Sequence, residues 1–237
     1  MTILASEKAR IIYSELTAAF RLSSNPESAK MQEAYMKYKM PYWGIASNPV
    51  KQIANSVFKE HLPVDNIEYR DILWYLFTNG NRREEWYAAM FMALKFKIFI
   101  TATNVDLYLD IVLKSQWWDI VDTTASNLIG PALSGGNLRK WLIPWVKHEN
   151  MWVRRAALLT QLKYKDMTDF ELLKDLILHT DHESDFFIRK AIGWALRQYS
   201  YTNPEAVIEL IEKRRDYLSN LSICEAQKGL IRMGYIK

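Results

Sequence analysis

The sequence predicts an all-α protein built as a helical solenoid. Glycine and proline are few, eight and seven in 237 residues, and alternating strand-like patterns are hard to find. Apolar residues recur instead at helical spacing, in segments that are separated by short connections. A motif also recurs about every 35 residues, a period typical of stacked helix pairs.

In the first half, helix starts define the elements. Ser6 can cap a helix over 6–22 whose apolar stripe includes Leu16 and Phe20. At Ser47, a helix starts with Pro49 in its first turn. Further helices in this half are expected over 29–39, 67–77, 82–100 and 105–113.

The same patterns continue in the second half. Helices are expected over 117–128, 137–146, 150–164, 169–179, 185–199, 203–213 and 218–233. All the connections are short and none reads as a linker. We therefore expect a single domain over residues 1–237.

The second half also repeats itself in sequence. The segment NMWVRRAA (150–157) recurs as DFFIRKAI (185–192), with a fainter echo at 220–226. A small residue marks the register of each repeat, with intervals of 35, 33, 35 and 35 between Ala88, Thr123, Ala156, Ala191 and Ala226. Each helix pair would bury its face on the next, so the series would form a superhelix with a concave surface.

The register aligns charged residues. The residue before the mark is Asp122 in one repeat, Arg155 in the next and Lys190 in the one after. Since packed helices lie roughly 8–10 Å apart, Asp122 should face Arg155. On the same face, Trp118 precedes Asp122 by one turn and Trp194 follows Lys190 by one turn.

Two interpretations of this constellation stay open. Asp122 and Arg155 could form a structural ion-pair ladder between repeats, with the tryptophans as packing. Alternatively, aromatic faces among clustered basic residues suit a nucleic-acid backbone that carries a cationic group. The net charge of +4 is a mild excess that suits a polyanion without demanding one.

Other classes of protein are disfavoured. The single cysteine, Cys224, excludes an internal disulfide framework and a cysteine-rich zinc site, and its apolar neighbours predict a small core residue. No segment is long and apolar enough for a membrane span, and no signal peptide is visible, so a soluble cytoplasmic protein is expected. The cluster His179-Thr180-Asp181-His182-Glu183 lies in a predicted turn without a fourth ligand, so no metal site is expected.

Three long motifs resemble a known family. KSQWWDIVD (114–122), NMWVRRAALLTQLKYK (150–165) and FFIRKAIGWALRQYSYTNPEAV (186–207) closely resemble the AlkD family of bacterial DNA alkylation-repair glycosylases. The resemblance covers nearly the whole chain and is weakest before Ala29 and after about Lys213. It implies HEAT-like repeats that cradle duplex DNA in a concave face. It also implies cofactor-free excision of cationic N3- and N7-alkylated purines, with the lesion left in the helix.

The resemblance assigns roles residue by residue. It implies that Asp122 is the catalytic acid, that Trp118 and Trp194 form an aromatic cleft, and that Arg155 lies beside the lesion. Tyr35 matches a tyrosine that closes the cleft from the N-terminal side. Positions that hold DNA phosphates match Lys163 and Arg197, and the basic clustering adds Arg154, Arg189 and Lys190 to the expected DNA-contacting set.

The resemblance also has a limit. At 47–52, where the family commonly has a more basic turn, the sequence SNPVKQ departs from it, which leaves the N-terminal phosphate contacts open. The expected function is a monomeric DNA glycosylase. The alternative is a non-catalytic solenoid that binds DNA or protein, and the presence of Asp122 and Arg155 favours the enzyme.

Overall fold

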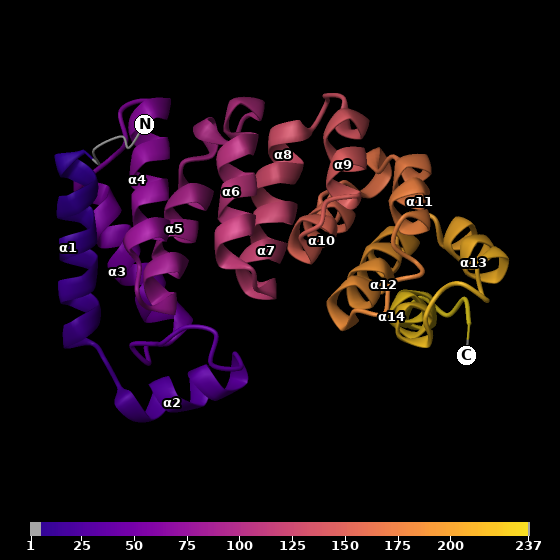
Figure 1. The fold of residues 1–237 in the computed structure, drawn as a ribbon, viewed down its shortest axis with the longest axis horizontal. Helices are drawn as coiled ribbons and strands as arrows, with labels where there is room; N and C mark the ends of the chain where they lie inside the picture. Colours follow the sequence, from indigo (N-terminus) through magenta and orange to yellow (C-terminus); the bar gives the residue numbers. More distant parts are fainter. Residues whose placement is uncertain (1–5, 237) are drawn as a thin grey trace. The chain divides into compact units, whose positions relative to one another are not determined.

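The computed structural model describes residues 6–236, and all the regular elements in this range are helices (Figure 1). This confirms the all-α prediction. Contacts between Cα atoms group the chain into two compact units, which divide between Leu107 and Tyr108.

The first unit consists of α1 (Glu7–Leu22), α2 (Pro26–Tyr35), α3 (Ser47–Glu60), α4 (Asn66–Asn79), α5 (Arg83–Lys95), the 3-10 turns η1 (Lys97–Phe99) and η2 (Ala102–Asn104), and the start of α6 (Val105–Ser115). Ser6 caps α1 as predicted, because its Oγ accepts a hydrogen bond from the Ala9 amide at 3.2 Å. The predicted helix over 82–100 is too long. It ends at Lys95, where the backbone tightens into η1.

A buried carboxylate fixes the connection between α2 and α3. The side chain of Glu84 is fully buried in α5 and accepts hydrogen bonds from the amides of Trp43, Gly44 and Ile45 at 2.9, 2.9 and 3.0 Å. The predicted helix over 29–39 is also displaced. It spans 26–35 and stops before Lys37, whose φ of 58° breaks the helix.

In the second unit, the rest of α6 is followed by α7 (Trp118–Thr124), the π-helix η3 (Ala125–Ile129), α8 (Gly130–Leu133), α9 (Leu138–Val146), α10 (Met151–Leu159), the 3-10 turn η4 (Lys165–Met167), α11 (Phe170–Leu178), α12 (Phe186–Ser200), α13 (Pro204–Lys213) and α14 (Asn220–Arg232). The predicted helix over 150–164 ends early, at Leu159. There the Gln161 side chain bonds the backbone N–H and C=O of Asp169 at 2.8 and 3.2 Å, which draws the chain into the next connection.

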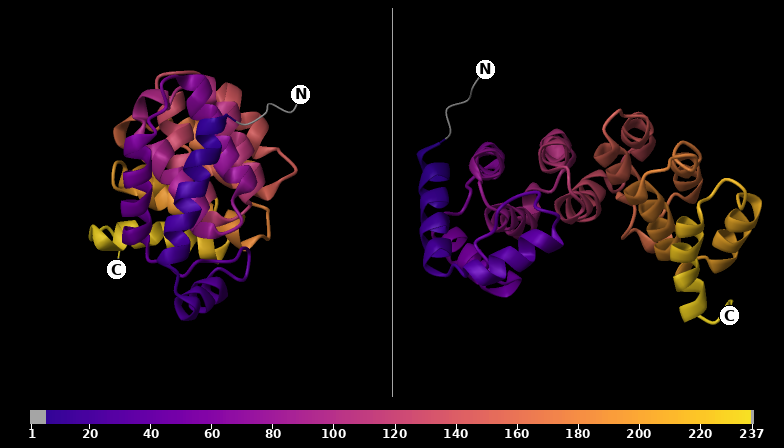
Figure 2. Two further views of the ribbon diagram at one scale, coloured as in Figure 1. Left: turned by 90° about the vertical axis from the view of Figure 1, so that its left-hand side faces the viewer. Right: turned by 60° about the horizontal axis from the view of Figure 1, so that its bottom comes forward.

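Side-chain contacts repeat with the period of the sequence. Polar bonds join residues that are 33 to 36 positions apart, namely Asp122–Arg155, Gly130–Tyr164, Arg139–Asp175, Asp181–Arg214 and Lys190–Glu225. Helices α12 and α14 lie side by side (Figure 1; Figure 2, right). These contacts confirm that successive helix pairs stack as in a solenoid.

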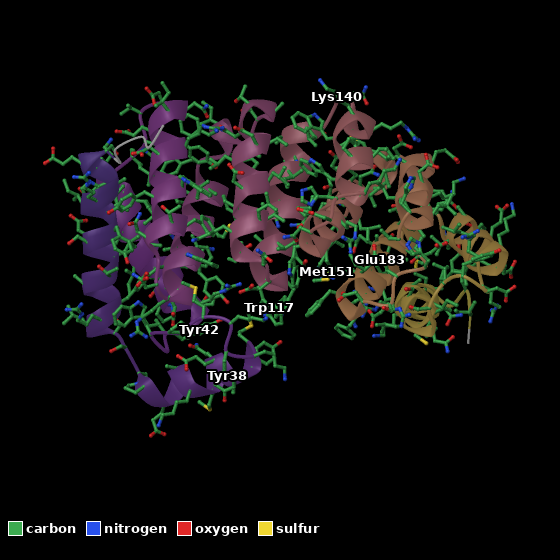
Figure 3. The ribbon with its side chains drawn as sticks, viewed as in Figure 1. Tyr38, Tyr42, Trp117, Lys140, Met151 and Glu183 are labelled. Carbon is green, nitrogen blue, oxygen red and sulfur yellow. The ribbon has the colours of Figure 1, made fainter. Side chains whose placement is uncertain are left out.

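Two helices of the second unit begin on the same side. Trp117 and Met151, which lie at or before the starts of α7 and α10, lie at the lower ends of these helices in Figure 3, whereas Lys140 of α9 lies at the opposite edge. Asn150 and Asp185 cap α10 and α12 by accepting hydrogen bonds from the amides two residues later, at 2.9 and 2.7 Å. The motif that marks the repeats in sequence therefore begins at helix caps.

The prediction for Cys224 is wrong. Its side chain is exposed, although Ile223 beside it is buried. Ile223, Ala226 and Leu230 form the packed face of α14, and Cys224 is rotated away from that face by one helical position. Apolar neighbours in sequence therefore did not predict the direction of this side chain.

Candidate active site on the inner helices

A buried ion pair joins α7 to α10. Both nitrogens of one edge of the Arg155 guanidinium bond the Asp122 carboxylate, with Nε–Oδ1 at 2.7 Å and Nη2–Oδ2 at 2.8 Å. Asp122 is 8% exposed and Arg155 is 3% exposed. The two residues face each other as the repeat register predicts, and a bidentate pair of this kind fixes the orientation of the carboxylate.

Arg155 also reaches a third helix. Its Nη1 donates a hydrogen bond to the carbonyl oxygen of Phe187 in the first turn of α12, and its guanidinium lies 5.8 Å from the centre of the Phe187 ring. One side chain therefore ties α7, α10 and α12 together. The position of Asp122 is fixed by the stacking of three helices.

The electrostatic setting of Asp122 is unusual. Burial raises the pKa of its carboxyl, the hydrogen bonds and charge of Arg155 lower it, and the nearby Asp119 raises it further. The net direction is a pKa above the ordinary aspartate value. A carboxylate that is poorly solvated and matched by only one cation interacts strongly with any further positive charge that approaches it.

The helix that carries Asp122 changes its winding directly after the site. Residues Ala125–Ile129 form a π-helix, in which the Gly130 amide bonds the Ala125 carbonyl, and Ser126 Oγ donates to the Asp122 carbonyl at 2.7 Å. The helical pattern over 117–128 predicts an ordinary α-helix, so the π-helix was not expected. Gly130-Pro131 was the available signal, since proline cannot donate to a continuing α-helix.

Aromatic side chains surround the start of these helices. Trp117 is buried, and its ring centre lies 5.6 Å from that of Trp152 and 5.2 Å from that of Phe187. Trp118 and Trp194, the two residues expected to form the cleft, are both half-buried. Neither residue is fully enclosed in the core, which is compatible with a ligand-binding surface.

The predicted DNA-contacting cations have partners within the protein. Arg154 bonds both carboxylate oxygens of Glu183 at 2.8 and 2.7 Å, and Arg189 Nε donates to the Glu183 carbonyl at 2.8 Å. Lys163, which is exposed, donates to Asn127 Oδ1. Their roles at DNA stay predictions, and Arg154 is the most fully engaged of these cations.

The other two cations meet a residue that sequence analysis missed. Lys190 Nζ and Arg197 Nη1 each bond the buried carboxylate of Glu225 at 2.6 Å. The signal was present in the repeat register, because Glu225 directly precedes the mark Ala226, as Asp122, Arg155 and Lys190 precede theirs. Tyr35 lies at the end of α2 in the first unit, where it is exposed, and its role in closing a cleft stays a prediction.

Within residues 6–236, no group of three or more histidine, cysteine, aspartate or glutamate side chains is placed to hold a metal ion. In the turn around His182, Asp181 bonds Arg214 and Glu183 bonds Arg154. None of the described helices has the length and apolar character needed to cross a bilayer.

Comparison with known proteins identifies the family. Residues 16–230 match the family model described as DNA alkylation repair enzyme. The chain belongs to this family. The matched range includes Asp122, Arg155, Trp118 and Trp194, and membership gives the chain a role in the repair of alkylated DNA.

A solved structure of a similar protein agrees with this membership. A predicted DNA alkylation repair enzyme from Enterococcus faecalis is 32% identical, with a TM-score of 0.79 over 87% of this chain and 96% of that one. A comparison with curated proteins gives no significant match. The family match and the similarity to the solved structure together establish the family and the fold.

Proposed function

We propose that this protein is a DNA glycosylase that hydrolyses the N-glycosidic bond of cationic N3- and N7-alkylated purines in duplex DNA. The observation that carries the proposal is the buried Asp122 carboxylate, held in one orientation by Arg155. Membership of a DNA alkylation repair family supports the substrate class. The partner is duplex DNA that contains the alkylated base.

The chemistry requires one well-placed carboxylate and no general acid. Alkylation at N3 or N7 gives the purine a positive charge, so the bond from C1′ to the base breaks with its electron pair moving to the purine, which leaves as a neutral molecule. The sugar becomes oxocarbenium-like in the transition state, as in glycoside hydrolysis. Water then adds to C1′ and loses a proton, which leaves an abasic sugar.

Asp122 is suited to two tasks, namely stabilising the cationic sugar and orienting the attacking water. Its negative charge stabilises the cationic sugar more strongly in a poorly solvated site than it would in water. An ionised carboxylate has about four acceptor positions, so the two bonds from Arg155 leave capacity to orient the attacking water. Arg155 thereby acts as the residue that positions the carboxylate.

Aromatic faces and cations complete the proposed site. Trp118 and Trp194 hold the cationic nucleoside, with each cation–π contact contributing about 0.5–2 kcal/mol. Tyr35, Lys163, Arg154, Arg189, Lys190 and Arg197 form the proposed set that contacts the DNA. In this scheme the sugar and its phosphates are gripped while the damaged base stays in the duplex.

One observation favours a second interpretation. Because Arg155 links three helices, the Asp122–Arg155 pair could serve only to hold the repeats together in a non-catalytic DNA- or protein-binding solenoid. The two interpretations differ in what the loss of the charge on Asp122 should do. A structural pair predicts that activity and stability fall together.

The deciding experiment replaces Asp122 with asparagine. We expect Asp122→Asn to lower the single-turnover release of 7-methylguanine from methylated duplex by roughly 10²-fold, the lower end of the 10²–10⁴-fold range for a positioned base, because the leaving group is good. Removing one partner of a buried ion pair also costs up to about 3–5 kcal/mol of stability. Duplex affinity and thermal unfolding are therefore measured on the same preparation.

A matched control separates stability from chemistry. Leu176 is fully buried in α11, a helix that carries neither member of the ion pair, and Leu176→Ala should cost about 2–5 kcal/mol. Assayed at a temperature where both variants are folded, Leu176→Ala should retain the wild-type rate. Full excision by Asp122→Asn, or an equal loss in both variants, would sink the catalytic assignment.

A further inference from the structure

One buried carboxylate gathers three cations between α12 and α14. Glu225 Oε1 accepts hydrogen bonds from Lys190 at 2.6 Å and from Lys228, and Oε2 accepts one from Arg197 at 2.6 Å. The Glu225 side chain is 3% exposed, whereas those of Lys190, Arg197 and Lys228 are 37%, 25% and 55% exposed. The four formal charges sum to +2, because three cations meet one anion.

Two glycines let the helices approach closely enough for this arrangement. Lys190 and Arg197 lie on one face of α12, two turns apart, with Gly193 between them. A Cβ atom at Gly193 would lie 2.5 Å from Glu225 Cβ, and one at Gly229 of α14 would lie 3.0 Å from the Arg197 carbonyl oxygen. Glycine at both positions therefore leaves room for the Glu225 carboxylate to reach Lys190 and Arg197.

The cluster occupies the same register position as the proposed catalytic pair and has a different charge balance. Asp122 and Arg155 neutralise each other, whereas Glu225 leaves two surplus positive charges. Burial raises the pKa of Glu225, but the hydrogen bonds from Lys190 and Lys228 and the nearby charges lower it to about 2. The carboxylate therefore stays ionised at neutral pH and keeps its three partners.

Surplus cations with spare donors suit an oxyanion. A lysine ammonium has three N–H donors and an arginine guanidinium has five, and the recorded bonds to Glu225 use one from each side chain. A tie between two helices requires only one cation. With Lys190 as that tie, Arg197 and Lys228 are additional, and because both are at least partly exposed they are better explained by an external anion.

We propose that Glu225 is a positioning residue that holds Lys190, Arg197 and Lys228 as a preformed site for a phosphate of the DNA backbone. The proposal rests on the proposed function and adds Glu225 and Lys228 to the DNA-binding surface. Long cationic side chains lose rotamer freedom when they grip a phosphate, and a buried carboxylate that orders them beforehand reduces this loss.

The test measures binding to an undamaged duplex over a series of salt concentrations. Glu225→Gln removes a negative charge, so simple electrostatics predicts tighter binding. Preorganisation instead predicts about tenfold weaker binding. Lys228→Ala should lower the slope of log affinity against log salt by about 1. Lys213→Ala is the control, because Lys213 is an exposed lysine on α13 paired with Glu209 in its own helix, and it should change neither quantity.

Base release provides a second readout that a structural role would not alter. In single-turnover excision, Glu225→Gln should raise the half-saturating protein concentration and leave the maximal rate unchanged, because phosphates position the duplex without touching the reacting sugar. Thermal unfolding fixes an assay temperature at which each variant is folded. If Glu225→Gln proves too unstable to assay, Lys228→Ala still decides, because it removes an exposed partner.

Two results would overturn the inference. Binding by Glu225→Gln that equals or exceeds the wild type would show that the carboxylate does not organise a site. A salt slope for Lys228→Ala equal to that of Lys213→Ala would show that no phosphate lies there. Because the duplex is undamaged, these results are independent of excision, whereas a wild-type protein that releases no base would contradict only the proposed glycosylase activity.

Discussion

Asp122 and Glu225 show how one register position can give two electrostatic outcomes. The pKa of Asp122 is raised chiefly by burial, so between the ordinary and the raised value its ionisation favours the unfolded chain, and its contribution to stability declines as pH rises. The pKa of Glu225 is shifted in the opposite direction, because the effect of its three cations exceeds that of burial. A buried carboxylate whose pKa is raised is a common feature of functional sites.

The lowered pKa of Glu225 predicts how the stability of the protein changes in acid. Its pKa falls from 4.5 to about 2 on folding, so its contribution is present above pH 4.5 and is lost as pH falls towards 2. The full contribution is on the order of 3 kcal/mol. Urea unfolding at several pH values should therefore show Glu225→Gln less stable than the wild type at pH 7, with the gap closing in acid. A gap that does not change with pH would contradict this account of the cluster.

At the scale of elements, the π-helix after Asp122 depends on a close helix contact. A Cβ atom at Gly130 would lie 2.5 Å from the Thr160 carbonyl oxygen at the end of α10, and the Gly130 carbonyl accepts a hydrogen bond from Tyr164 Oη at 2.7 Å. Glycine therefore lets α10 approach the turn directly behind Asp122. The same approach brings Arg155 of α10 within reach of that carboxylate.

Replacement of Gly130 should move α10 away from the π-helix. Gly130→Ala is expected to lower the free energy of unfolding by roughly 1–3 kcal/mol, because the clash with a backbone oxygen outweighs the gain in helix propensity. Base release should fall as well, since Asp122 and Arg155 lie on the displaced elements. Gly136→Ala is the matched control, because its nearest contact is 3.3 Å away in an exposed connection. Equal stability of the two variants in thermal unfolding would refute the close-contact argument.

At the scale of the whole molecule, a net charge of +4 leaves DNA affinity dependent on where the cations lie. Lys163 is exposed beyond α10 and is held by Asn127 of the π-helix. The side chain therefore lies on the connection that follows the Arg155 helix, where a phosphate flanking the damaged nucleotide would lie in the proposed complex.

Replacement of Lys163 should weaken binding without regard to the lesion. We expect Lys163→Ala to reduce affinity for damaged and undamaged duplex equally and to lower the salt slope by about 1, since phosphate contacts carry no information about the base. Fluorescence anisotropy in a salt series measures both quantities, with Lys213→Ala as the control that removes the same charge elsewhere. A selective loss of affinity for the damaged duplex would instead place Lys163 at the lesion.

The helical fold, the repeat and the pairing of Asp122 with Arg155 could all be predicted from the amino-acid sequence. Helical period is a local property of the chain, and a repeat of 33 to 35 residues sets which residues of successive helices face each other. This explains why a charge pair 33 residues apart could be placed without coordinates. The long motifs carried the family for the same reason, since they span whole repeats.

The depth at which each group is buried, and the partners it contacts, depend on tertiary packing and could not be predicted from the sequence. The exposure of Cys224, the π-helix at Ala125–Ile129 and the gathering of three cations on Glu225 all depend on how closely helices approach. That distance is set by side chains on both packed faces, including glycines whose effect appears only in contact. The pKa directions of Asp122 and Glu225 follow from the same packing, because desolvation and neighbouring charge are properties of the assembled site.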